Sequence, residues 1–212
     1  MINLNEISEL LQKGRAPQVK EQIAAALNEG VTAETILNDA LFAGMAVIGE
    51  KFKNNQVFIP EVLIAARAMN AGIEVLKPYL VNESTENKGT VVIGTVKGDL
   101  HDIGKNIVKI MLEGKGLNVI DLGTDVAPER FVQEAVANNA KIICCSALLT
   151  TTMVEMKNVV DAAKNAGVRD KIKIMLGGAP VTQEFCDSVG ADYYTPDAAS
   201  CADIAISVCS EN

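Results

Sequence analysis

The sequence contains a single histidine, His101, and it lies next to two aspartates in a short segment that also holds two glycines. The segment reads Gly98-Asp99-Leu100-His101-Asp102-Ile103-Gly104-Lys105. An imidazole can bind a metal or transfer a proton at neutral pH. A chain with one histidine cannot build a zinc or iron site from several histidines. This segment is the first candidate for a functional site.

Small and hydroxyl-bearing residues follow two later apolar runs of the sequence. If those runs are neighbouring strands of one sheet, these residues would leave a slot beside it for a sizeable ligand. They are Ser146, Thr150, Thr152, Gly177 and Gly178, and Leu148 lies among them.

Three other motifs do not fit these residues. A phosphate-binding P-loop would need Gly at 99 and Ser or Thr at 106, where the sequence has Asp99 and Asn106. The dinucleotide fingerprint GxGxxG is absent from the same turn. A receiver domain would need an aspartate at the position of Ser146.

Each candidate residue also has an ordinary structural explanation. Asp99 and Asp102 could cap the helix expected after residue 103, and His101 could be a solvated loop residue. Ser146 and the threonines could be polar groups at strand ends, and the paired glycines could form a tight turn. Only their joint placement at neighbouring strand ends favours a ligand site.

A polar run at residues 82–89 divides the sequence into halves with different hydrophobic periods. Before it, apolar residues recur at helical spacing, which predicts a bundle of about four helices, and Thr32 and Pro60 suit the first turns of two of them. We therefore expect a helical domain over residues 1–86 and a second domain over residues 89–212.

In the second half, five β-branched runs alternate with helical segments. The expected strands cover 90–95, 117–122, 141–146, 172–176 and 191–195, and the expected helices cover about 103–115, 128–138, 151–167, 182–188 and 198–209. This pattern predicts an α/β fold with a five-stranded parallel, flavodoxin-like (Rossmann-like) sheet, which binds its ligands at the carboxyl ends of the strands.

Composition and charge disfavour several classes of function. The 212 residues include 19 Lys and Arg against 27 Asp and Glu, and the net charge of -8 argues against binding to nucleic acid or to a membrane surface. No stretch has the length and apolarity of a membrane span, and the first residues do not resemble a secretory signal. The five cysteines lack CxxC spacing and are expected to be reduced, buried core residues of a cytoplasmic protein.

The motifs together resemble those of a known family. Asp99-x-His101-x-x-Gly104, Ser146-x-Leu148 and Gly177-Gly178 match, in order and separation, the DxHxxG, SxL and GG signature of cobalamin-binding domains that hold their cofactor base-off and His-on. The helical half, through residues 49–52, 58–62 and 65–69, resembles the cap module of cobalamin-dependent methionine synthase and of stand-alone corrinoid proteins. The likeness covers essentially the whole chain and is greatest for corrinoid proteins that serve methylamine, methanol and methoxyaromatic methyltransferases.

This resemblance implies roles for the motif residues. His101 would be the lower axial ligand of cobalt in place of the cofactor's dimethylbenzimidazole. Asp99 would accept a hydrogen bond from the other ring nitrogen of His101. Thr152 would add a hydroxyl to this chain of hydrogen bonds, at a position where the family often has serine. Ser146 or Thr150 would form hydrogen bonds with the polar atoms of the displaced nucleotide tail in the slot. The residues expected to contact the cofactor are Gly98, Asp99, His101, Asp102, Ile103, Gly104, Ser146, Leu148, Thr150, Thr152, Gly177 and Gly178.

The resemblance also implies a methyl carrier, alternating between methylcobalamin and cob(I)alamin. It would take a methyl group from a substrate-specific methyltransferase and deliver it to a second one, which passes it to tetrahydrofolate or coenzyme M. A reductive activase is a further candidate partner, and no activity is expected of the chain alone. The helical half would cover the upper face of the cofactor and move about residues 82–89, with Phe58 and Met45 as candidate contacts unless they belong to the bundle core.

Other functions remain open on the sequence alone. One is the adenosylcobalamin-binding subunit of a mutase, against which the helical module argues. Another is a cobalamin-dependent sensor that regulates transcription, against which the length and charge argue. A third is cobalamin storage or delivery. The sequence does not identify the methyl donor, which could be a methylamine, methanol, a methoxyaromatic compound or a betaine.

Overall fold

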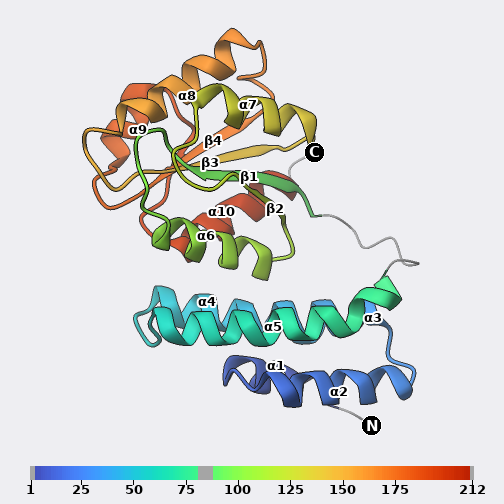
Figure 1. The fold of residues 1–212 in the computed structure, drawn as a ribbon. Coiled ribbons are helices and arrows are strands. Elements are labelled where there is room, and N and C mark those ends of the chain that lie inside the picture. Colours follow the sequence, from blue (N-terminus) through green and yellow to red (C-terminus); the bar gives the residue numbers. More distant parts are fainter. Residues whose placement is uncertain (1–2, 81–87, 211–212) are drawn as a thin grey trace. The chain divides into compact units, whose positions relative to one another are not determined.

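The computed structural model describes residues 3–80 and 88–210 and divides into two compact units (Figure 1). One unit contains the helices up to α5, and the other contains the β-sheet and the helices that cover it. The predicted boundary and hinge at residues 82–89 lie, apart from Lys88 and Gly89, outside the described residues.

The first unit is a bundle of helices, as the apolar spacing predicts. Thr32 accepts a hydrogen bond from the Thr35 N–H at 3.2 Å, and Pro60 lies in the first turn of α5, so both predicted helix starts are confirmed. Within the bundle, α2 packs against α5, and α1 packs against η1 and α4. The elements are α1 (Leu4–Gln12), α2 (Ala16–Asn28), α3 (Ala33–Ile36), the π-helical η1 (Leu37–Phe42), α4 (Ala43–Lys53) and α5 (Ile59–Leu80).

The second unit contains a parallel sheet with the strand order β2-β1-β3-β4-β5, which confirms the predicted flavodoxin-like fold. In its register Thr95 is opposite Ser146, and Ser146 is opposite Gly177, so three neighbouring strands end at the same level. The strands are β1 (Thr90–Thr95), β2 (Asn118–Asp121), β3 (Ile142–Ser146), β4 (Lys173–Gly177) and β5 (Tyr193–Tyr194).

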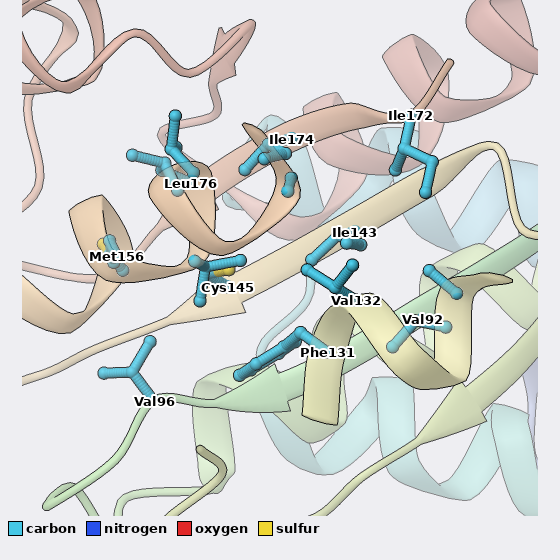
Figure 2. Close-up of a cluster of buried hydrophobic side chains, with 14 of the residues drawn as sticks. Val92, Val96, Phe131, Val132, Ile143, Cys145, Met156, Ile172, Ile174 and Leu176 are labelled. Carbon is cyan, nitrogen blue, oxygen red and sulfur yellow. The ribbon is translucent and has the colours of Figure 1, made fainter. Parts of the chain in front are cut away.

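Helices cover both faces of this sheet, with α7 and α8 on one face and α6 and α10 on the other (Figure 1). The core under α7 is shown in Figure 2, where Phe131 and Val132 lie over Val92 and Ile143 of the sheet. A Cβ at Gly94 would come within 2.8 Å of the Phe131 ring, so this glycine makes room for the aromatic side chain. The helices are α6 (Ile103–Gly114), α7 (Pro128–Ala137), α8 (Val154–Asn165), α9 (Gln183–Val189) and α10 (Ala198–Ser210).

Two predictions from composition can be compared with this fold. All five cysteines are buried and none forms a disulfide, which confirms that they are core residues with free thiols. Over residues 3–80 and 88–210, no helix is both long and apolar enough to cross a membrane.

A buried lysine joins the first turn of α6 to the end of β2. The Lys105 side chain is 2% exposed, and its Nζ donates to Asp121 Oδ1 and to Asn106 Oδ1, each at 2.7 Å. Burial raises the pKa of Asp121, but the hydrogen bonds from Lys105 and from the Gly123 N–H, together with the nearby charges of Lys105 and Lys109, outweigh it and hold that pKa below its usual value. The ion pair therefore stabilises the fold whenever Asp121 is ionised.

We expect Lys105→Met to lower the free energy of unfolding by about 2–4 kcal/mol at pH 7, because it leaves a largely buried carboxylate without its main partner. Since the pKa of Asp121 is depressed in the folded state, the contribution of the pair is present above the unfolded pKa of about 3.9 and is lost as the pH falls through the folded pKa. Urea unfolding at pH 7 and at pH 3 should therefore show the variant approaching wild type in acid. Lys109→Met is the control, since Lys109 lies 3.5 Å from Asp121 and is more exposed. An equal loss at both pH values would contradict this account of the pair.

Candidate functional site

His101 lies in the loop between β1 and α6, close to the carboxyl ends of the central strands. Its side chain is 51% exposed, but the ring does not move freely in solvent, because Nδ1 lies 2.6 Å from Asp99 Oδ1. The backbone N–H of His101 donates to the same oxygen at 3.0 Å. His101 is thus an exposed loop residue, but one edge of its ring is held by Asp99.

Asp99 is fully buried and joins two loops. Its Oδ1 accepts from His101, while Oδ2 accepts from the Leu148 N–H at 2.8 Å and the Leu149 N–H at 3.2 Å. The Thr152 hydroxyl donates to Oδ2 at 3.0 Å. These donors belong to the loop of His101 and to the segment after β3, and not to the first turn of α6, so helix capping does not explain Asp99.

The charge of Asp99 determines the tautomer of the histidine. Burial alone would raise the pKa of this carboxyl, but the N–H donors of His101, Leu148 and Leu149 outweigh burial and hold the pKa well below its usual range. An ionised carboxylate only accepts hydrogen bonds, so Nδ1 of His101 must be the donor. In the neutral ring, Nε2 then carries the lone pair and can bind a metal.

The other predicted residues of the loop between β1 and α6 lie around Asp99 and His101. Gly98 has a φ of +78°, a backbone conformation that favours glycine. The Asn106 N–H donates to the Asp102 carbonyl at 2.8 Å and its side chain donates to Asp102 Oδ2 at 3.1 Å, so Asp102 lies at the start of α6. Ile103 is 68% exposed, and a Cβ at Gly104 would meet no atom within 4 Å, which leaves open space beside the loop.

The predicted residues at the ends of β3 and β4 do not all converge on Asp99. Thr152 and the backbone of Leu148 reach it, whereas Ser146 lies at the end of β3 and Thr150 is exposed in the loop that follows. Gly178 has an ordinary structural reason to be glycine, because its φ is +133° and a Cβ would lie 1.9 Å from the Ala147 carbonyl oxygen.

Sequence reasoning missed three residues that support this loop. The Thr95 hydroxyl donates to the His101 carbonyl at 2.8 Å, and Asp125 accepts from the Gly98 N–H at 2.7 Å. Leu149 contributes only a backbone donor, which leaves no signal in the residue type. The position of Thr95 at a strand end and that of Asp125 in a turn were available signals.

Thr152 offers a test of the buried network. Thr152→Val keeps the shape of the side chain but removes the hydroxyl donor to Asp99, and we expect it to lower the free energy of unfolding by about 1–2 kcal/mol. Thr152→Ser retains the hydroxyl and should stay closer to wild type. Urea unfolding of both variants checks this, and equal losses in the two would show that the methyl group matters more than the hydrogen bond.

The donor set fits a metal that brings most of its own ligands. Within the part of the chain that the structure describes, no group of three or more His, Cys, Asp and Glu side chains is placed to hold a metal ion. His101 instead offers one nitrogen, held by a charged buried partner, next to the open space at Gly104. A cobalt ion in a corrin needs one such nitrogen from the protein, so these residues fit the cofactor expected from the motifs.

The two candidate residues of the helical unit differ in exposure. Met45 is 2% exposed, as expected of a core residue, whereas Phe58 is 64% exposed and precedes α5. The bundle-core explanation is therefore wrong for Phe58, whose ring is available to a ligand or partner.

Both halves of the chain match models of protein families. Residues 89–201 match the B12 binding domain, and residues 4–77 match a second family that is also described as a B12 binding domain. The chain is 46% identical over 181 residues to trimethylamine corrinoid protein 1 of Methanosarcina acetivorans, covering 84% of this chain and 82% of the relative. It is 42% identical to dimethylamine corrinoid protein 1 of the same organism, covering 84% of this chain and 86% of that relative.

Solved structures also show similarity to cobalamin-binding proteins. The chain is similar, with a TM-score of 0.89 and 34% identity, to a chain of the methanol:cobalamin methyltransferase complex MtaBC from Methanosarcina barkeri, covering 97% of this chain and 79% of that one. It is also similar to a cobalamin-binding protein from Desulfitobacterium hafniense, with a TM-score of 0.79 and 31% identity, covering 98% and 99% of the two chains.

Proposed function

We infer that the protein holds a cobalamin and carries a methyl group on the cobalt between two methyltransferases. The basis is that the chain belongs to the corrinoid proteins of methylamine and methanol methyltransferase systems. One observation supports His101 and Asp99 as the residues that would hold the cobalt. The Nδ1 atom of His101 is held 2.6 Å from the ionised, fully buried Asp99, which directs the lone pair of the ring to Nε2.

In this proposal His101 Nε2 would bind the cobalt in place of the cofactor's own base, so that the cofactor would be held base-off and His-on. Asp99 fixes the tautomer and orientation of the ring and makes it a stronger ligand, as carboxylates do for metal-bound histidines. Thr152 and the backbone of Leu148 hold the carboxylate in place. Cobalamin supplies a cobalt that accepts and donates the methyl group, and the protein controls its orientation and surroundings.

The remaining predicted residues would receive the nucleotide tail of the cofactor. Gly104 leaves open space, and at Gly177 a Cβ would come no closer than 3.6 Å to another residue, so neither glycine is required by close packing. Ser146 or Thr150 would bond the polar atoms of the tail, as the family motif implies. Gly178 would line the same space, although its own geometry already requires glycine.

We propose that the partners are a substrate-specific methyltransferase and an acceptor methyltransferase, with a reductive activase as a further candidate. The names of the relatives support this, since they refer to trimethylamine and dimethylamine corrinoid proteins and to a complex with methanol:cobalamin methyltransferase. Specificity for one methyl donor would then lie in the partner enzyme.

The test is methyl transfer with purified components. The protein is loaded with hydroxocobalamin, reduced, and mixed with methyltransferases specific for trimethylamine, dimethylamine, monomethylamine or methanol, each with its substrate. We expect the absorbance to change to that of the methylated corrinoid with at least one enzyme, and no change when the enzyme is omitted. A protein that binds corrinoid but is methylated neither by these enzymes nor by those specific for a methoxyaromatic compound or a betaine would contradict the methyl-carrier proposal.

A further inference from the structure

We infer that Thr95, which lies outside the cobalamin motif, is a positioning residue that holds the loop of His101 in its ligand-ready geometry; its consequence for the cofactor rests on the proposed function. Thr95 is the last residue of β1 and is fully buried. Its hydroxyl donates to the carbonyl oxygen of His101 at 2.8 Å. This bond fixes the backbone on the carbonyl side of the residue whose ring is to bind cobalt.

The backbone of Thr95 also holds the loop after β2. Its N–H donates to the Gly123 carbonyl at 2.9 Å, and its own carbonyl accepts from the Val126 N–H at 3.0 Å. All three polar groups of this buried residue are therefore used, and two loops are tied to one strand end.

The loop after β2 in turn holds the residues before His101. Asp125 accepts from the Gly98 N–H at 2.7 Å, and the Asp125 N–H donates to the Asp99 carbonyl at 3.0 Å. Asp125 has a φ of +54°, a left-handed conformation that aspartate adopts more readily than most residues with a side chain. Thr95 is thus connected to Gly98 and Asp99 through the hydrogen bonds of this loop, and to His101 by a direct hydrogen bond.

This arrangement separates two tasks. The segment after β3 fixes the Asp99 carboxylate, whereas Thr95 and Asp125 fix the backbone on which Asp99 and His101 are mounted. A shift of that backbone would turn the ring even with the Asp99 bonds intact. Ligand geometry held in advance by supporting hydrogen bonds is what makes a site bind tightly.

The test compares Thr95→Val, which keeps shape and strand preference but removes the hydroxyl, with Thr95→Ser, which keeps the hydroxyl. In the protein without cofactor, we expect Thr95→Val to speed hydrogen exchange of the His101 and Asp125 amides about tenfold and to leave the amides of the β3–β4 ladder unchanged. With hydroxocobalamin, Thr95→Val should bind about tenfold more weakly and show a smaller His-on fraction in its absorbance spectrum. Thr95→Ser should restore both properties to within about twofold.

A second pair of variants tests the contribution of Asp125 to this support, separately from that of the Thr95 hydroxyl. Asp125→Gly removes the carboxylate where glycine accepts the positive φ, and Asp125→Asn keeps an acceptor oxygen at the same place. We expect faster exchange of the Gly98 amide in Asp125→Gly and near wild-type exchange in Asp125→Asn. Unchanged loop exchange and affinity in Thr95→Val, or equal defects in Thr95→Ser, would overturn the inference. If wild type bound no corrinoid, the proposed function would fail, while the exchange data would still decide whether Thr95 holds the loop.

Discussion

Replacing His101 with alanine is expected to weaken the binding of hydroxocobalamin by about 100-fold or more, since loss of supporting residues alone costs metal sites about 10–100-fold. The variant removes the single nitrogen that the loop offers to a metal and leaves Asp99 with its donors from Leu148, Leu149 and Thr152. Titration followed by absorbance measures the affinity and shows whether the dimethylbenzimidazole of the cofactor is displaced. Wild type should bind base-off, and the variant should not bind in the His-on form.

Two controls separate loss of the ligand from damage to the fold. The His101 ring is half exposed and Asp99 keeps its donors from Leu148, Leu149 and Thr152, so the variant without cofactor should stay folded and lose no more than about 1–2 kcal/mol in thermal unfolding. Added imidazole should restore part of the affinity by occupying the space left by the ring. Equal affinity and equal spectra for variant and wild type would show that the histidine is not the ligand.

Replacing Asp99 with alanine is expected to cost about 3–5 kcal/mol in the free energy of unfolding, because it leaves the N–H donors of His101, Leu148 and Leu149 without their shared acceptor. The affinity for hydroxocobalamin should also fall by about 10–100-fold, since the ring loses the partner that orients it. Urea unfolding and absorbance titration measure the two effects separately.

Asp102→Ala is the matched control for this prediction. Asp102 lies in the same loop and carries the same charge, but it is exposed and its side chain accepts from the neighbouring Asn106. We expect a change in unfolding free energy within about 1 kcal/mol for this variant. A similar loss of stability in both variants would contradict the special role of the buried carboxylate.

The architecture could be predicted from the sequence because its two hydrophobic periods are clear. The β-branched run of Thr90–Thr95 forms β1 over those same residues, and the run of Lys141–Ser146 forms β3 over Ile142–Ser146. The short last strand is the weakest agreement, since the predicted run of 191–195 forms only Tyr193–Tyr194. Local apolar patterns determine strands inside a sheet better than strands at its edge, where one neighbour is missing.

The site could be predicted only in part. The spacing of Asp99 and His101 places both in one loop, and the structure confirms their contact. The donors from Leu148 and Leu149 are backbone groups, which any residue supplies, so the sequence carries no sign of them. At Gly178 the sequence motif indicated a ligand slot. The structure shows that close packing against the backbone of Ala147 already requires glycine there.

The most direct test of the central claim is electron paramagnetic resonance of the protein loaded with cobalamin and reduced to Co(II), with histidine labelled by 15N. Because His101 is the only histidine, the label marks one residue. An axial 14N splits the cobalt lines into triplets, and an axial 15N splits them into doublets. We predict triplets for unlabelled protein and doublets for labelled protein, which would place His101 on the cobalt. Triplets in both samples would show that the dimethylbenzimidazole remains bound, and would contradict the assignment of His101 as the cobalt ligand.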